Sequence, residues 1–368
     1  MMKTNIIKDI KAVALAAVIA GASILAPSCK NAIYDDEGDC AVTYRIQFRY
    51  DLNLKWADAF ASEVRSVRLY AFDTNGTLVA EYRDKGAHLA APGYSIPLDL
   101  PAGNYHFVAW CGLDNDGARV QNFTVPQTSV GSTRLDDLKC RMTRYTDNTY
   151  GTVSSDWLEF MFHGDLDAEL PVNDDGGEYT YVMPLTKDTN HIRIILQHLS
   201  GEDLDVSKFG FTIEDENGYY AHDNSLLDDE TITYIPYSTS TAEAGIIKED
   251  KSEIGTRGLE TCKTAIADFS VGRMMSSHEN RMRLTITTFD EKTGDTVRIA
   301  TVPVIDYALL ARDYYEQYYN HVMADDQEFL DREDEYTMTF FLDENQRWYS
   351  VVIYINSWRI VLKDVELS

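Results

Sequence analysis

Cys29 is the residue whose position most clearly predicts a chemical event. It follows three lysines within the first eleven residues and an apolar run that extends from Ala12 to Ala26 with a short interruption. This is the layout of a secretory signal, which is removed from the mature chain and is too short to span a bilayer. In bacteria, lipoprotein processing acylates a cysteine at the cleavage boundary and makes it the new N-terminus. We therefore expect residues 1–28 to be a signal peptide and Cys29 to carry lipid.

The residues before Cys29 leave other outcomes open. Ala26, Pro27 and Ser28 precede the cysteine, and the leucine that usually stands three places upstream is one place earlier, at Leu25. An ordinary signal cleaved near Ala26 or Ser28 would leave Cys29 as one more thiol, and an uncleaved signal would stay as an anchor.

Four further cysteines could take part in disulfide, metal or nucleophilic chemistry. In an oxidising compartment four cysteines allow three pairings, and the sequence does not choose among them. The absence of a CxxC spacing argues against zinc or thioredoxin-like chemistry. Cys111, within an apolar stretch, is expected to be buried or disulfide-bonded rather than catalytic. These cysteines are Cys40, Cys111, Cys140 and Cys262.

The remaining reactive side chains form no catalytic motif. The sequence has no Gly-x-Ser-x-Gly elbow, no phosphate loop of the Walker type and no HExxH pair. The acidic run 325–335 lacks the spacing of a calcium loop, and is expected to be a solvated helix end. We therefore predict no enzymatic activity, no cofactor, no metal and no small-molecule substrate.

The charge of the chain excludes one class of partner. With 60 acidic and 33 basic residues, the formal net charge is −27, and such a field repels a phosphate backbone. Nucleic acid is therefore not an expected partner. Acidic residues also follow Cys29 closely, so residues 29–41 are predicted to be a lipidated acidic tether. Their acidity could accompany export to the cell surface, or could simply make a solvated linker.

Alternating apolar residues predict the strands that must carry the rest of the chain. The alternation begins at Val42, and Asn-Gly pairs at Asn75 and Asn217 each follow an apolar run, which is a strong hairpin signal. The same alternation returns at Ile192, Ile194 and Leu196, and this restart suggests two copies of one plan. We predict an all-β fold of two tandem sandwich domains, an N-terminal one at 42–184 and a C-terminal one at 185–368.

Two segments of the second predicted domain stand out. Residues 307–330 have apolar side chains at helical spacing and should form the one notable helix, in which four tyrosines between 314 and 319 are expected to pack in the core. The final segment is strand-like and could complete its own sheet or lie in the groove of a partner. Its candidate partner-strand residues are Trp358, Ile360, Leu362, Val365 and Leu367.

Several stretches together resemble one family, the FimB-type fimbrial anchor lipoproteins of Gram-negative gut and oral anaerobes. They extend from the start of the mature chain to its end. The resemblance rests on Ile33–Cys40, Phe48–Asn53, Val67–Asp73, Pro101–Tyr105 into Ala109–Trp110, Gln327–Arg332 and Ile353–Trp358.

The resemblance implies a non-enzymatic, structural role. Members of this family have two Greek-key β-sandwich domains of transthyretin-like character, hold a pilus rod at the outer membrane and limit its length. Subunits of such pili join by strand exchange. For this chain, Cys29 would then be the membrane end, the segment from Trp358 onward would contact the rod, and the partner would be a major fimbrial pilin subunit. The alternative is a tip adhesin or glycan-binding surface lipoprotein with the same fold; a secreted hydrolase is the third possibility.

Overall fold

The computed structural model describes residues 42–114, 121–172, 176–247, 259–277, 282–291, 293–343, 345, 347–349 and 352–361. Cys29, Cys40 and the tether lie outside the described residues, as do Leu362, Val365 and Leu367. Tyr44–Pro171 and the described residues from Tyr179 onward belong to one compact unit, and the contacts discussed below lie within it. Within the described ranges, no helix combines the length and apolar character that a membrane span requires.

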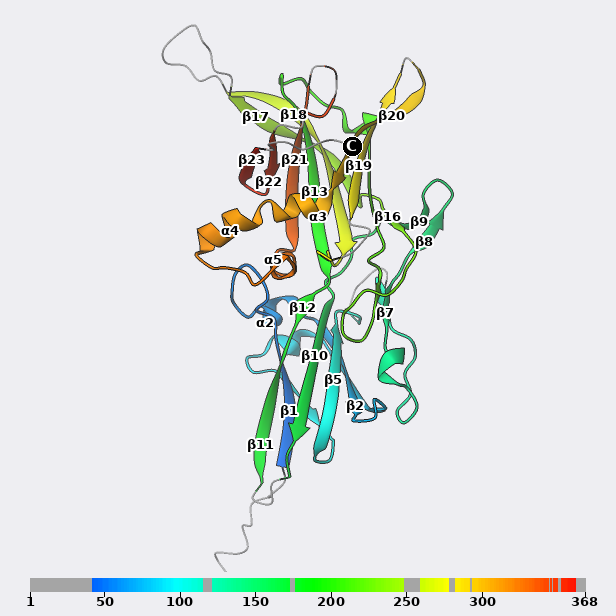
Figure 1. Cartoon of the computed structure of the whole chain (residues 1–368), viewed down its shortest axis with the longest axis vertical. Coiled ribbons are helices and arrows are strands. Elements are labelled where there is room, and N and C mark those ends of the chain that lie inside the picture. Colours follow the sequence, from blue (N-terminus) through cyan, green and yellow to red (C-terminus); the bar gives the residue numbers. More distant parts are fainter. Residues whose placement is uncertain are drawn as a thin grey trace, which may run out of the picture. The chain divides into compact units, whose positions relative to one another are not determined.

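Strands make up most of the described chain, which confirms the all-β prediction (Figure 1). The strands of the first half are β1 (Val42–Arg49), β2 (Ser66–Asp73), β3 (Leu78–Lys85), β4 (Ser95–Leu98), β5 (Gly103–Cys111), β6 (Phe123–Thr124), β7 (Cys140–Met142), β8 (Tyr145–Asp147), β9 (Gly151–Ser154), β10 (Phe162–Leu170), β11 (Gly177–Pro184) and β12 (Thr186–Lys187). Those of the second half are β13 (Thr189–His198), β14 (Phe209–Asp215), β15 (Tyr219–Tyr220), β16 (Ile232–Tyr234), β17 (Ser238–Ile247), β18 (Leu259–Gly272), β19 (Arg283–Asp290), β20 (Asp295–Pro303), β21 (Glu335–Leu342), β22 (Val352–Ile355) and β23 (Trp358–Val361).

The helices are few and short. The α-helices are α2 (Phe60–Glu63), α3 (Val304–Leu309), α4 (Arg312–Tyr319) and α5 (Asp326–Arg332), and the 3-10 helices are η1 (Ala87–Ala90), η2 (Leu135–Asp137) and η3 (Val206–Lys208). The single helix predicted at 307–330 is present in part, but it begins earlier and is interrupted. Asn320 ends α4 in the left-handed conformation, with φ 52°, and the Asp325 side chain accepts a hydrogen bond from Glu328 N to start α5.

Two sheets are formed mainly by the first half of the chain. Their strand orders are β11-β1-β4 and β12-β10-β5-β2-β3. The hairpin between β2 and β3 turns at the predicted Asn75–Gly76 pair, where Gly76 has φ 70°. Asp73 stabilises this turn, because its Oδ1 accepts hydrogen bonds from the backbone N–H groups of Asn75 and Thr77.

Three further sheets hold the second half of the chain and part of the first. Their orders are β17-β18-β13-β21-β22-β23, β20-β19-β14-β16-β9-β8 and β15-β7-β6. Strand β13 is central in the first of these: it pairs antiparallel with β18 and parallel with β21. Strands β7, β8 and β9 precede residue 184, yet they join sheets with β15 and β16. The domain limits 42–184 and 185–368 stay a prediction, as does the transthyretin-like topology.

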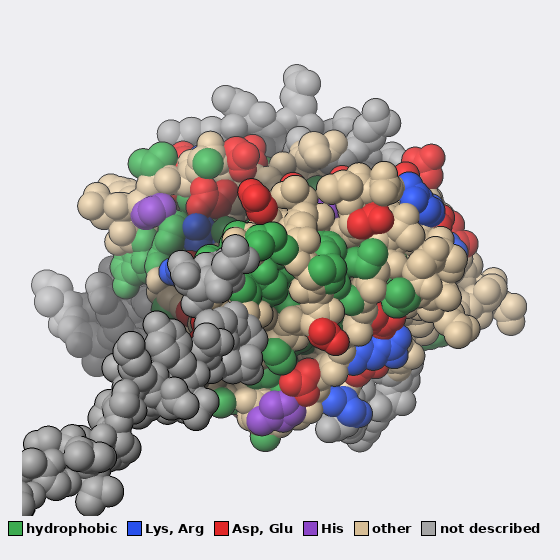
Figure 2. All heavy atoms as spheres, turned by 90° about the horizontal axis from the view of Figure 1, so that it is seen from below, with side chains coloured by type: hydrophobic (Ala, Val, Ile, Leu, Met, Phe, Trp, Pro, Cys, Tyr) green, Lys and Arg blue, Asp and Glu red, His purple; other side chains and the backbone are tan. Residues whose placement is uncertain are grey.

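The core lies between the sheets and follows the predicted alternation. Ile192, Ile194 and Leu196 of β13 are buried, whereas Arg193 between them is exposed. Burying each large aliphatic side chain contributes roughly 1.5–3 kcal/mol, so this alternation fixes which face of β13 points inward. Acidic and basic side chains lie interspersed on the end of the molecule seen in Figure 2, with hydrophobic ones between them.

The described cysteines are buried thiols. Cys111, Cys140 and Cys262 are free, so no disulfide joins them to one another. Burial raises the pKa of the Cys111 and Cys140 thiols well above the usual range, which disfavours the thiolate that a nucleophile needs. Both cysteines therefore act as small apolar core residues.

Candidate functional site

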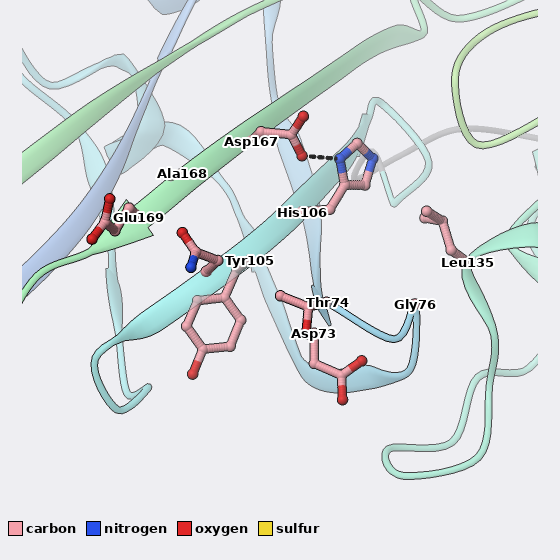
Figure 3. Close-up of a pocket in the computed structure, with 10 residues that line it drawn as sticks. Asp73, Thr74, Gly76, Tyr105, His106, Leu135, Asp167, Ala168 and Glu169 are labelled. Atoms are coloured by element: carbon pink, nitrogen blue, oxygen red, sulfur yellow. Dashed lines mark hydrogen bonds and ion pairs between the residues drawn. The ribbon is translucent and has the colours of Figure 1, made fainter.

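A hollow at one end of the five-stranded sheet is the first place to look for chemistry (Figure 3). It has a volume of about 470 Å³ and is lined by the β2–β3 turn, the start of β5 and the end of β10. His106 and Asp167, which are opposite each other on β5 and β10, are joined by a 2.8 Å contact between Nδ1 and Oδ1. The Asp73 carboxylate binds its own turn. The hollow thus holds a hydrogen-bonded histidine–aspartate pair on the sheet surface and a capped turn, with no nucleophile beside a base.

The acidic run 325–335 is occupied by structural contacts. Besides capping α5 through Asp325, it supplies Asp331, whose carboxylate accepts two hydrogen bonds from Arg273 at 2.7 and 2.8 Å. No group of three or more metal-ligating side chains occurs in the described part of the chain. The other ion pairs of the run are Asp326–Arg312, Glu328–Arg332 and Asp334–Lys187.

The carboxyl-terminal sheet edge is the feature that the anchoring interpretation depends on. We use this term for β22, β23 and the turn between them, Asn356–Ser357. Strand β23 pairs with β22 and with no other strand of the described residues, so one of its sides is a sheet edge. An edge strand presents N–H and C=O groups that can pair with another chain.

Asn356 holds this hairpin in place. The residue has φ 51°, which asparagine tolerates better than most residues, and this suits a two-residue turn. Its Oδ1 accepts a hydrogen bond from Thr337 N at 2.7 Å, and its Nδ2 donates to Tyr315 OH at 2.7 Å and to Glu333 Oε2 at 3.1 Å. One side chain therefore connects the turn to β21, to α4 and to the end of α5.

Trp358 rests on the tyrosines of α4. Its ring is stacked with that of Tyr314 at 5.4 Å between centroids and meets Tyr315 and Tyr318 edge-on at 5.9 Å each. The expectation that these tyrosines fill the core is correct for Tyr315, which is 8% exposed. It is wrong for the other three, which are exposed at 37%, 70% and 42%: Tyr314, Tyr318 and Tyr319. The helix surface beside β23 is thus aromatic and open to solvent.

The structure places two of the five predicted partner-strand residues. Trp358 and Ile360 lie in β23, where Ile360 is opposite Ile353 of β22 and is buried. Their side chains contact the protein's own sheet and helix, so the groups that β23 presents at its edge are those of the backbone. Sequence reasoning missed the roles of Asn356 and Glu333. An Asn-Ser pair between two apolar runs was the available signal for the turn.

Comparison with known proteins gives this edge a context. A sequence profile described as "Fimbrillin-A associated anchor proteins Mfa1 and Mfa2" matches residues 36–364. The chain belongs to this family. The minor fimbrium anchoring subunit Mfa2 of Porphyromonas gingivalis is similar to it, with 24% identity over 261 residues that make up 70% of each chain.

Solved structures share the fold. A protein of Bacteroides thetaiotaomicron described as a candidate adhesin matches with a TM-score of 0.71 and 31% identity, over 88% of this chain and 98% of its own. A second protein of that organism, described as a candidate polysaccharide-binding protein, matches with a TM-score of 0.69 and 26% identity, over 88% of this chain and 99% of its own. The fimbrial anchor Mfa2 of P. gingivalis has the same fold, with a TM-score of 0.59 and 18% identity over 88% and 99%. The predicted resemblance to fimbrial anchors is confirmed.

Glu333 makes the stability of this region depend on pH. Glu333 is 7% exposed, and burial raises the pKa of its carboxyl group from 4.5 to about 7. Between these values the folded protein holds a proton that the unfolded chain releases. The free energy of unfolding therefore falls as pH rises through this window, and the contribution of Glu333 is lost above about pH 7.

We expect the Glu333→Gln variant to lose this contribution to the pH dependence. The free energy of unfolding of the variant minus that of wild type should rise by about 3 kcal/mol between pH 4.5 and pH 7.5. The difference between the two proteins isolates Glu333, because the buried carboxyl groups of Asp188 and Asp215, whose pKa values are also raised to about 7, are present in both. Urea unfolding followed by tryptophan fluorescence measures the free energy of unfolding at each pH. If this free energy changes with pH by the same amount in both proteins, Glu333 does not titrate as described.

Proposed function

We propose that this protein is the anchor subunit of a fimbria: a non-enzymatic lipoprotein that is tethered to the outer membrane through Cys29, is exposed at the cell surface, and is joined to the rod by strand exchange. The observation that carries the proposal is the family match over residues 36–364. In this role the protein would hold the rod at the cell and limit its length, and its partner would be the major fimbrial pilin.

The edge of β23 supports the strand-exchange part of the proposal. In a hairpin closed by a two-residue turn, the residues that flank the turn, here Ile355 and Trp358, form a hydrogen-bonded pair. The backbone groups of Arg359 therefore point away from β22, toward the sheet edge. A strand of the pilin could pair there through main-chain hydrogen bonds, and apolar residues continue past β23 in the sequence at Leu362, Val365 and Leu367.

Two observations on the described residues fit the non-enzymatic part of the proposal. In the described residues, the hollow at the β2–β3 turn carries no nucleophile-base pair, and the buried cysteines are poor nucleophiles. The family to which the chain belongs is one of fimbrial anchor proteins.

We expect an Arg359→Pro variant to lose its pilin. Proline removes the outward N–H of residue 359 while it leaves the hydrogen-bonded pairs with β22 in place, so the fold should lose less than about 1 kcal/mol. The measurement is the amount of pilin that co-purifies from envelope extracts, with thermal unfolding of each variant as a check on folding.

Arg359→Thr is the matched control, because it removes the same charged side chain and keeps the N–H. It should retain the pilin, whereas a truncation after Val361, which spares the β22–β23 hairpin, should weaken binding.

Full retention of the pilin by a folded Arg359→Pro variant would argue against pairing at this edge. Intact fimbriae that have lost only their adhesion would instead favour the tip adhesin.

The lipid tether is tested by Cys29→Ala. We expect this variant to leave the membrane fraction, because acyl chains contribute about 0.8 kcal/mol per buried CH₂ and no acyl chain can form on alanine. Membrane pellets and soluble fractions are compared by immunoblotting, with Cys40→Ala as the control that keeps Cys29. Retention of the Cys29→Ala variant in the pellet would contradict lipidation at this residue.

A further inference from the structure

A recess on the outer face of the sheet that contains β13 carries a further inference. It has a volume of about 290 Å³, and β13, β18 and β21 form its floor. Trp157 comes from the loop between β9 and β10, and Tyr237 from the loop between β16 and β17. Of the β13 side chains that point away from the core, those of His191 and Arg193 line this recess. The side chains that decide its chemistry are Trp157, His191, Arg193, Tyr237, Asp268 and Glu335.

Aromatic rings form one side of the recess. The Trp157 ring lies on the His191 ring, with 3.9 Å between centroids and an angle of 16°, and Tyr237 meets Trp157 edge-on at 5.2 Å. Even so, Trp157 is 44% exposed. Stacking on His191 holds the indole in one orientation, so it forms a fixed apolar platform that solvent can reach.

Polar groups lie beside this platform at fixed positions. Arg193 is opposite Asp268 on β18, and its Nε donates to Asp268 Oδ1 at 2.7 Å. The Arg193 side chain is 54% exposed, so it keeps N–H groups for a ligand. Glu335 of β21 is level with His191 and is exposed. The recess therefore offers donors and acceptors next to an aromatic ring.

This combination fits one class of ligand. A pyranose ring has an apolar face of C–H groups that can cover an indole, and hydroxyl groups around its rim that can both donate and accept hydrogen bonds. Arg193 would donate to such hydroxyls, and Asp268 and Glu335 would accept from them. Because the recess has two carboxylates, of Asp268 and Glu335, and one guanidinium, of Arg193, it disfavours an anionic sugar. The volume, close to the lower limit of small-molecule sites, suits one or two sugar rings.

We propose that this recess binds a neutral glycan, with Trp157 as the stacking platform. The site would add a carbohydrate ligand to an anchor protein, and it does not depend on whether β23 pairs with a pilin. Glycan binding by the purified chain can therefore fail or succeed independently of the anchoring role.

Binding to a printed array of neutral and sialylated oligosaccharides tests the proposal first. Wild-type protein should bind neutral structures, and a titration of the strongest of these should change the tryptophan fluorescence. Trp157→Ala should weaken binding at least tenfold, and Glu335→Gln, which keeps the size of the side chain, should weaken it severalfold.

Phe289→Ala is the control, because Phe289 of β19 is also an exposed aromatic residue, at 52%, but does not line the recess. It should bind as wild type does. Binding restricted to sialylated structures, no binding to any neutral glycan, or unchanged binding by both Trp157→Ala and Glu335→Gln would each overturn the proposal. Thermal unfolding of each variant shows whether a loss of binding has a structural cause, and the Glu335→Gln result decides the matter if Trp157→Ala is unfolded.

Discussion

A single buried ammonium group connects three distant parts of the chain. Lys187 of β12 is almost fully buried, and its Nζ contacts Glu63 Oε2 at 2.6 Å and the carboxylate of Asp334. It also lies 3.9 Å from the centre of the Phe160 ring. A lysine without these partners would be costly to bury, and loss of one member of a buried ion pair typically costs about 3–5 kcal/mol. The end of α2, strand β12 and the residue that precedes β21 are therefore held at one point.

Helix α5 extends this connection toward the carboxyl-terminal sheet edge. Arg332 donates from Nη1 to the carbonyl oxygens of Asp51 and Asn53 at 3.1 and 3.3 Å, and its guanidinium lies 3.6 Å from the centre of the Trp56 ring. In return, Leu54 N donates to Arg332 O at 3.1 Å. Strands β21 to β23 follow this helix directly. Their position, and with it the edge at which we propose a pilin strand pairs, thus depends on contacts with residues that follow β1.

Local patterns predicted the elements better than they predicted their partners. Alternation at Ile192–Leu196 and the Asn75–Gly76 pair identified a strand and a hairpin because both signals act over a few residues. The pairing of β7 with β15 and of β9 with β16 depends on contacts between residues about 80 apart, which no local pattern records.

Local patterns were equally poor at predicting which residues of the candidate sites are buried. Helical spacing predicted an apolar stripe on α4, but Tyr318 faces solvent, because burial depends on which elements cover the helix. In the sequence, Glu333 is one of several acids in a charged run, and only the fold shows that it is buried beside Asn356. Cys29 and the tether lie outside the described residues, so the lipid anchor stays a prediction from sequence.

Membership in a family of fimbrial anchor proteins agrees with the role that we propose for the sheet edge at β23 and for the lipid that the sequence predicts at Cys29. The proposed account makes the protein the link between membrane and rod.

The most direct test of this account is electron microscopy of cells that lack the gene, with fibres counted on cells and in the medium and their lengths measured. The account predicts long fibres shed into the medium, and normal attachment and length when the gene is restored. Fibres of normal length that stay on the mutant cells would contradict it.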